Sequence, residues 1–367
     1  MNRVFYLLSI LLSTSLVLAG PFKQRENFYN HNYKESDLLI MVFGASVTAQ
    51  KNNIWSSFIE FFNKKLKRKH FFIISGHGGE HLYPQSLCHI DTACSLKPDI
   101  CIVDWFDTGF LETNDITKKS IETLIRKLRQ IGCYIIFYYH FRLNDNPEKR
   151  VSFIKYVDSI AYMYGVSSYN EYEAVDCHNI NGESLLRDVV HTTPEGSKIL
   201  GEIFCDYFLK IQKNGFNYFH SLYPLLFFPP KNEFYNIKKQ TITLDMIHGK
   251  TKKDIDGYWC LNKKNVLELA LDKNLFAIEM KIGSYSPIIE CSERESGINH
   301  LFQLWDPYCH YERKQILPFE NITQGEWFFS ITNNPIDYSK CRRKVDFTGV
   351  EKMLKVKDFF CYEGYEN

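Results

Sequence analysis

A serine and an acid–histidine pair stand at opposite ends of the first half of this chain. Ser46 lies in the segment Gly-Ala-Ser-Val-Thr at 44–48, and Asp188 precedes His191 by three residues. A serine hydroxyl is a weak nucleophile at neutral pH, so it needs a base, and a carboxylate at this spacing can orient a histidine for that role. Either motif alone occurs often by chance. Their combination predicts nucleophilic chemistry at Ser46, with His191 as the base and Asp188 as its partner.

The elements that must position these residues follow from the pattern of apolar side chains. Continuous apolar runs at 38–43, 71–74, 100–103 and 134–139 are typical of parallel strands buried on both faces. Apolar residues at helical spacing predict helices over 54–66, 116–130, 148–164 and 194–212. Alternating strands and helices indicate a three-layer α/β fold with a parallel sheet. Ligands bind at the carboxyl ends of such strands, which is where Ser46 lies.

The pattern of apolar residues is different in the second half of the chain. Short strand-like runs separated by turn residues occur at 241–244, 266–271, 276–282, 287–291 and 327–332. They predict a β-rich domain, in the form of a small sandwich. We therefore expect an N-terminal segment over 1–19, a catalytic domain over 35–212, a proline-containing linker over 213–231, and the β-rich domain over 232–367.

The tryptophans of the second half leave two interpretations of that domain open. In the first, the domain is structural and buries Trp259, Trp305 and Trp327. In the second, it binds carbohydrate, and at least one of these indole rings is exposed as a stacking platform.

The composition excludes some classes of partner. With 44 basic and 43 acidic side chains, the net charge is +1. Nucleic-acid binding requires a clustered basic excess, so no nucleic-acid partner is expected. Histidines, aspartates and glutamates show no convincing metal-ligand spacing in the sequence, and there is no phosphate loop, so we expect neither a metal nor another cofactor.

The N-terminus and the cysteines bear on the compartment. Residues 1–19 combine Arg3, an apolar run over 7–18 and small residues before Gly20, as in a secretory signal peptide. An uncleaved segment would instead associate the protein with a membrane. In both cases the protein is expected to be secreted or extracytoplasmic, where its 11 cysteines could form disulfides and leave at least one thiol unpaired.

The order of these motifs resembles the SGNH (GDSL-like) hydrolase superfamily. The block around Ser46 has Ala45 where the family usually has aspartate, Asp188 and His191 match the last block, and Thr-Pro-Glu-Gly at 193–196 resembles its continuation. The resemblance covers about half of the chain. It implies a flavodoxin-like sheet, with Ser46, His191 and Asp188 as the triad of an ester hydrolase or acyltransferase.

The resemblance also implies an oxyanion hole. The backbone N–H groups of Ser46 and Gly78 would contribute to it, although Gly76 or Gly79 could replace Gly78. Thr108 stands where the family has asparagine, so its hydroxyl would donate in place of an amide. Removal of one oxyanion donor typically lowers turnover about 10²–10³-fold.

Asp107, His140 and Arg142 are candidates for substrate binding, although His140 and Arg142 could equally be a satisfied pair in a loop. We expect a serine esterase that removes an O-acyl group, in the first place acetyl, from a carbohydrate or from another small ester. Two alternatives remain: an O-acyltransferase that acetylates a polysaccharide, and an inactive SGNH-like protein that binds glycans.

Overall fold

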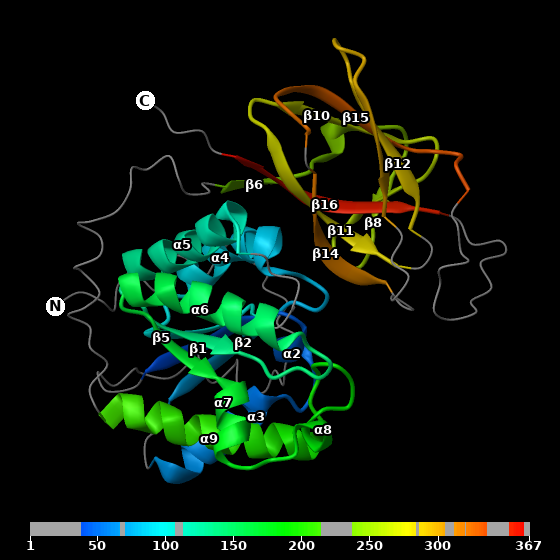
Figure 1. The fold of residues 1–367 in the computed structure, drawn as a ribbon. Coiled ribbons are helices and arrows are strands. Elements are labelled where there is room, and N and C mark those ends of the chain that lie inside the picture. The colour runs from blue at the N-terminus through cyan, green and yellow to red at the C-terminus, as the bar shows by residue number, and fades with distance from the viewer. Residues whose placement is uncertain are drawn as a thin grey trace. The chain divides into compact units, whose positions relative to one another are not determined.

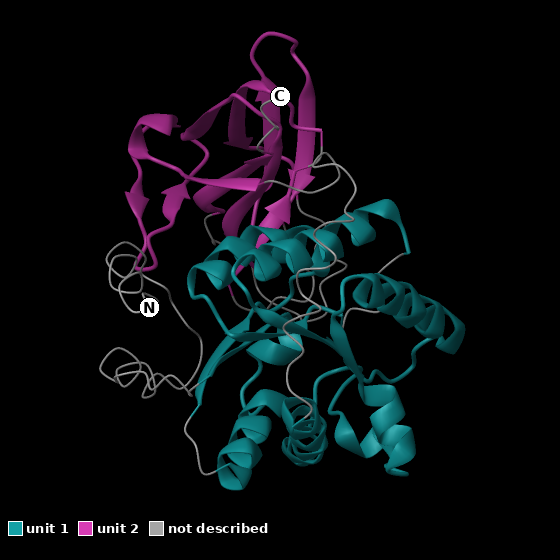
Figure 2. Ribbon diagram, turned by 90° about the vertical axis from the view of Figure 1, so that its left-hand side faces the viewer, with its two compact units in different colours: residues 1–234 teal, residues 235–367 magenta. Residues whose placement is uncertain are grey.

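The chain divides into two compact units, Met1–Phe234 and Tyr235–Asn367, which Figure 2 shows in different colours. The computed structural model describes residues 38–66, 70–106, 113–213, 237–283, 286–304, 312–319, 321–335 and 352–362. The predicted export segment and the predicted linker from residue 214 onward lie outside these ranges. Within them, no helix is long and apolar enough to cross a membrane.

The first unit is built on a five-stranded sheet in the order β2-β1-β3-β4-β5, in which all neighbours are parallel (Figure 1). The strands are β1 (Leu39–Gly44), β2 (Phe71–Gly76), β3 (Ile100–Asp104), β4 (Tyr134–Tyr139) and β5 (Ser167–Asn170). Every residue of β1, β3 and β4 is buried, which explains why these strands are continuous apolar runs in the sequence. The predicted α/β fold with a parallel sheet is confirmed.

Helices cover both faces of this sheet (Figure 1). On one face lie α4 (Leu87–Ser95), α5 (Asp115–Gln130) and α6 (Pro147–Met163), and on the other lie α3 (Ile54–Lys65) and α9 (Pro194–Lys213). The side chains of Asn53, Asn114 and Asn146 cap α3, α5 and α6 by accepting a backbone N–H three residues on. Among the described residues of this unit, the shorter helical segments are α2 (Ser46–Ala49), η2 (Leu82–Ser86), α7 (Glu171–Cys177) and α8 (Gly182–Leu185).

Aromatic packing holds α3 and α9 against the sheet. Trp55 and Phe58 from α3 and Phe204 and Phe208 from α9 are fully buried and belong to one core cluster with residues of β1, β3 and β4. Trp55 meets Phe204 edge-on, with 5.6 Å between ring centroids. This cluster holds α3, the next long helix after Ser46 in the chain, against the sheet.

The second unit contains two antiparallel sheets, in the orders β13-β12-β15-β10-β7 and β14-β11-β16-β9-β8, with β6 paired to β16. One apolar core takes residues from both sheets, including Leu267 and Trp327 from the first and Ile278 and Val356 from the second. The predicted β-rich second half is therefore confirmed. The strands are β6 (Ile237–Thr241), β7 (Ile247–His248), β8 (Lys252–Lys253), β9 (Trp259–Leu261), β10 (Val266–Leu271), β11 (Leu275–Ile282), β12 (Ile288–Glu293), β13 (Asn299–Gln303), β14 (Arg313–Pro318), β15 (Gly325–Ile331) and β16 (Leu354–Tyr362).

Two of the three tryptophans of this unit have partners in its interior. Trp327 is fully buried, and its indole N–H donates to the Thr323 carbonyl at 2.8 Å. Trp259 is half-buried and donates to the Ile242 carbonyl at 2.8 Å. Trp305 lies outside the described residues. For the two described rings, the structural interpretation of the tryptophans fits better than an exposed stacking platform.

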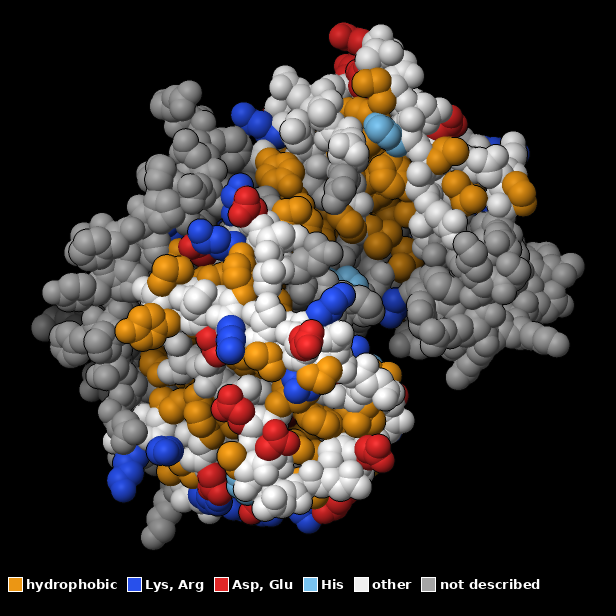
Figure 3. Space-filling view, viewed as in Figure 1, with side chains coloured by type: hydrophobic (Ala, Val, Ile, Leu, Met, Phe, Trp, Pro, Cys, Tyr) orange, Lys and Arg blue, Asp and Glu red, His pale blue; other side chains and the backbone are white. Residues whose placement is uncertain are grey.

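The described cysteines and the surface charges complete the description. Nine cysteines fall within the described ranges, all of them as thiols, whereas Cys309 and Cys341 lie outside. The predicted disulfides therefore gain no support from the described residues. On the face that Figure 3 shows, acidic and basic side chains are interspersed over the described residues, in line with the net charge of +1.

Gly76 offers a test of how tightly the end of β2 packs on the turn formed by residues 45–49. A Cβ atom at this position would lie 2.3 Å from the Ala49 backbone nitrogen, so Gly76→Ala forces α2 and β2 apart. We expect Gly76→Ala to lower the free energy of unfolding by about 1–3 kcal/mol in urea denaturation. Gly78→Ala is the matched control, because the nearest atom to its Cβ would be 4.0 Å away. Equal stability of both variants would contradict this packing.

Candidate active site

Ser46 follows the carboxyl end of β1, which lies between β2 and β3 in the sheet. It is the first residue of the four-residue helix α2, and Ala45 joins it to the strand. The Ala45 N–H donates to the backbone carbonyl of Asp104 at 3.0 Å, which ties this turn to the end of β3. The neighbouring strands β2 and β3 end on either side of the turn, so Ser46 stands at the edge of the sheet where their carboxyl ends meet.

The structure brings Ser46, His191 and Asp188 together in a line of hydrogen bonds. His191 Nε2 lies 3.1 Å from Ser46 Oγ, and His191 Nδ1 lies 3.0 Å from both carboxylate oxygens of Asp188. The pair comes from a loop that precedes α9, and Ser46 comes from the other end of the domain sequence. The separations are within hydrogen-bonding reach, which is the geometry that a serine and its base require.

The loop that carries the histidine is shaped by its own aspartate. Asp188 Oδ1 accepts the backbone N–H groups of Val190 at 3.0 Å and His191 at 2.8 Å, while Leu186 and Thr192 form an antiparallel bridge at the base of the loop. Partial burial raises the pKa of Asp188, but these N–H groups and the imidazole outweigh it and hold the pKa below its usual value. The carboxylate is therefore ionised at neutral pH, as a partner of His191 must be.

The loop after β2 lies beside α2. The His77 N–H donates to the Gly44 carbonyl at 3.0 Å, so the start of this loop is tied to the end of β1. Gly76 packs against the Ala49 backbone, and Gly79 has φ +76°, whereas the Gly78 backbone is exposed. Of the three glycines considered for the oxyanion hole, Gly78 thus has the most open surroundings.

Three of the other candidate site residues remain predictions, and for His140 the structure fits the alternative of a satisfied polar group better than a place in the cleft. Thr108 and Asp107 lie outside the described residues. Arg142 is half-buried in the loop after β4. His140 was one candidate for lining the substrate cleft, but its side chain is only 2% exposed. The reason is electrostatic, because its imidazole lies between two buried carboxylates.

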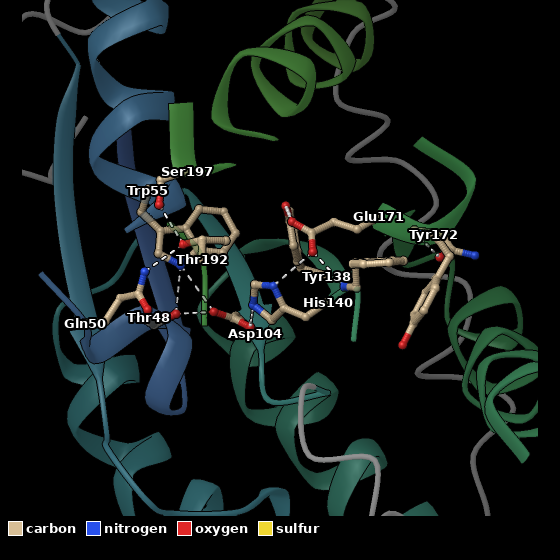
Figure 4. Close-up of polar contacts among 12 residues, drawn as sticks. Thr48, Gln50, Trp55, Asp104, Tyr138, His140, Glu171, Tyr172, Thr192 and Ser197 are labelled. Atoms are coloured by element: carbon tan, nitrogen blue, oxygen red, sulfur yellow. Dashed lines mark hydrogen bonds and ion pairs between the residues drawn. The ribbon is translucent and has the colours of Figure 1, made fainter. Parts of the chain in front are cut away.

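These carboxylates belong to Asp104, at the end of β3, and Glu171, at the start of α7 (Figure 4). His140 Nε2 forms an ion pair with Asp104, and its Nδ1 lies 3.3 Å from Glu171 Oε2. Glu171 also accepts the Phe141 N–H at 2.7 Å and the Tyr138 hydroxyl. Burial alone would lower the pKa of His140, but the two carboxylates outweigh it and raise the pKa well above its usual value.

The same network reaches the nucleophile turn. Asp104 Oδ2 accepts the hydroxyl of Thr48 and, at 3.2 Å, the indole N–H of Trp55 (Figure 4). Thr48 lies on α2, two residues after Ser46. The polar groups are buried and hydrogen-bonded to one another, so the turn is held by contacts of fixed geometry. Thr48 and Glu171 were not predicted as members of the site, because no local pattern in the sequence marks a buried pair of residues far apart in the chain.

A second link joins the nucleophile turn to the histidine loop. Gln50 Nε2 donates to Thr192 Oγ1 at 2.7 Å, and Thr192 is in turn 2.6 Å from the hydroxyl of Ser197 on α9 (Figure 4). Gln50 follows α2 directly, and Thr192 follows His191. His191 and Ser46 are therefore connected through neighbouring residues of the chain as well as through their own hydrogen bond.

One group of side chains near the site has the composition of a metal site. His77, Glu80 and His89 place a ligand atom each within 4.8 Å of one another. The sequence had suggested no such cluster, because the three residues are brought together by the turn after β2.

The buried ion pair of His140 gives a prediction about stability and pH. Its pKa is higher in the folded state than in the unfolded chain, so its contribution to stability is complete below about pH 6.5 and declines as the pH rises toward the folded-state pKa. His140→Gln should lower the free energy of unfolding by about 3–5 kcal/mol at pH 6, because it leaves the carboxylates unpaired. The loss should become smaller toward pH 9 in urea denaturation. A difference that is the same at every pH would show that His140 is not charged in the folded state.

Comparison with known proteins supports this architecture. Neither a protein-family model nor a curated protein matches the sequence. A solved two-domain esterase active on acetylated mannans is similar over 90% of this chain and 92% of its own, with a TM-score of 0.66 and 12% identity. The same kind of esterase co-crystallised with mannopentaose gives 13% identity and a TM-score of 0.66 over the same shares of the two chains. The lipase/acylhydrolase from Enterococcus faecalis covers 48% of this chain and 96% of its own, with 15% identity and a TM-score of 0.41. The chain therefore shares the fold of this two-domain esterase, in which an α/β unit with a parallel sheet is followed by a β-rich unit.

Proposed function

We propose that the first unit is a serine ester hydrolase, with Ser46 as nucleophile, His191 as general base and Asp188 as the residue that orients and stabilises the imidazole. The observation that carries this proposal is the continuous line of contacts, 3.1 Å from Ser46 Oγ to His191 Nε2 and 3.0 Å from His191 Nδ1 to Asp188. These residues lie at the carboxyl edge of a parallel sheet, where open α/β folds bind their ligands.

The reaction would proceed through an acyl-enzyme. As Ser46 Oγ attacks the ester carbonyl, His191 Nε2 takes the hydroxyl proton, and Asp188 stabilises the resulting imidazolium. The imidazolium then gives this proton to the departing alkoxide, so the alcohol leaves and Ser46 carries the acyl group. Water, deprotonated by His191, attacks this ester, and the imidazolium returns the proton to Ser46 Oγ as the acid leaves. The backbone N–H groups of Ser46 and Gly78, with the Thr108 hydroxyl, would hold the oxyanion in both steps.

We further propose that the substrate is an O-acylated carbohydrate, in the first place an acetylated one. The likeness to an esterase active on acetylated mannans supports this substrate class. The exposure of the triad is a second support, because the side chains of Asp188 and His191 are 49% and 26% exposed. A base this accessible suits the ester groups of a large, solvated polymer. Such a substrate is extracellular, in keeping with export directed by residues 1–19.

Replacement of the nucleophile is the direct test. Ser46→Ala should abolish release of acetate from an activated acetyl ester and from acetylated mannan, because no hydroxyl remains to form the acyl-enzyme. The thermal midpoint should stay within a few degrees, since Ser46 contributes one hydroxyl at a strand end. Ser184→Ala, at an exposed serine of α8, is the matched control and should keep full activity. Adding an oligosaccharide acceptor to the assay separates hydrolysis from transfer, and turnover by Ser46→Ala would refute the triad.

Thr108 tests the third oxyanion donor. If its hydroxyl donates to the oxyanion, Thr108→Val should lower kcat about 10²–10³-fold and change KM little, because the bond strengthens only as negative charge develops. Thr108→Asn restores an amide donor and should recover much of the loss. Full activity in the valine variant would mean that the backbone N–H groups are sufficient.

A further inference from the structure

His77, Glu80 and His89 form a compact cluster beside the loop after β2. His89 Nε2 on α4 lies 2.8 Å from Glu80 Oε2, and His77 Nδ1 lies 3.8 Å from the same oxygen. The Glu80 side chain is only 5% exposed, while those of His77 and His89 are partly accessible. One nitrogen of each imidazole and a carboxylate oxygen of Glu80 thus lie within 4.8 Å of one another, beside two partly exposed histidines.

A neighbouring hydroxyl orients one of the imidazoles. His77 Nε2 lies 3.0 Å from Ser75 Oγ, so this nitrogen is occupied and Nδ1 is the one directed to Glu80. Metal-binding histidines usually have their second nitrogen held by such an outer partner, which fixes the tautomer and the ring. The indole of Trp105 stacks on His77, with 5.7 Å between centroids and 17° between planes, and limits its movement.

We propose that His77 Nδ1, His89 Nε2 and a carboxylate oxygen of Glu80 bind one divalent transition metal ion of the zinc class. Two histidines and a glutamate are a ligand set that zinc uses, with a fourth position left for water. Both nitrogen and carboxylate ligands suit zinc and its neighbours better than calcium or magnesium, which prefer all-oxygen sites.

Binding requires one adjustment of the cluster. The His77 and His89 rings are stacked, with 3.7 Å between centroids and 22° between planes. Nitrogen lone pairs lie in the ring planes, so one ring must turn before both nitrogens can face a single ion. His89 is the ring that turns, because the indole of Trp105 stacks on His77 and holds that ring in place.

The position of the site gives the ion a structural effect. Its ligands flank Gly78 and Gly79, and they connect the loop after β2 to α4. A bound ion would therefore fix the loop that carries the proposed oxyanion donor, and this consequence rests on the proposed function. Metal binding itself does not rest on it, so we test binding in the Ser46→Ala protein as well, where affinity should be unchanged.

Calorimetry with Zn²⁺ on the full chain, after removal of metal with a chelator, should give one ion per chain. Glu80→Gln and His89→Gln should each weaken binding at least about tenfold, the range seen when a metal's supporting groups are removed. His178→Gln is the matched control, because His178 lies beside the exposed Cys177, where a stray ion would otherwise bind. Equal affinity in the wild type and both site variants, loss of binding only in His178→Gln, or no binding by the wild type would overturn the proposal.

A measurement on the wild type alone keeps the proposal testable if a variant fails to fold. X-ray absorption of the zinc-loaded protein should show nitrogen and oxygen ligands at about 2.0–2.2 Å, with the signature of two imidazoles. A sulfur shell at about 2.3 Å would place the ion at a cysteine instead and would refute the site.

Discussion

The position of the proposed nucleophile depends on one buried carboxylate, that of Asp104. Its backbone carbonyl accepts the N–H of Ala45, and its side chain accepts the hydroxyl of Thr48, so a single residue holds the turn on both sides of Ser46. An ionised carboxylate in the interior costs several kcal/mol unless it is paired. His140 supplies the opposite charge, and Glu171 in turn holds His140. The geometry at Ser46 is thus stabilised by a buried chain of charges, formed by Asp104, His140 and Glu171, that the substrate need not contact.

The parallel sheet makes this chain of charges possible. Asp104 ends β3, His140 follows β4, and Glu171 follows β5, while Ser46 follows β1. All of these strands run in one direction, so their last residues meet at one edge although the sequence separates them widely. Groups held on rigid strand ends lose little further freedom when a transition state forms, which is the advantage of preorganised sites. The architecture therefore brings both the reacting groups and their supports to one place.

The sequence predicts this architecture where the physical signal is local. Buried strands such as 134–139 are continuous apolar runs, and helices such as 194–212 repeat apolar residues at the helical period. Strand β5, Ser-Ser-Tyr-Asn, has four residues of which only Tyr169 is buried, so it has no such run and was missed. The contact between Ser46 and His191 followed from a motif pair, whereas the burial of His140 could not be foreseen. A polar residue after a strand has the same local sequence whether it faces a cleft or pairs with a carboxylate that lies 31 or 36 positions away.

The hydrogen bond between Gln50 and Thr192 has a consequence for motion. If the loops that carry Ser46 and His191 fluctuated independently, the distance between the serine hydroxyl and the imidazole would change by the sum of the displacements of the two loops. A direct bond between their neighbours makes the loops move in phase, so that the gap varies far less than the position of either loop. Thr192 is also bonded to Ser197 on α9, a 20-residue helix packed against the sheet through Phe204 and Phe208. The partly exposed loops at this edge of the unit are thus held by the buried core. The site can therefore be open to solvent and still be rigid.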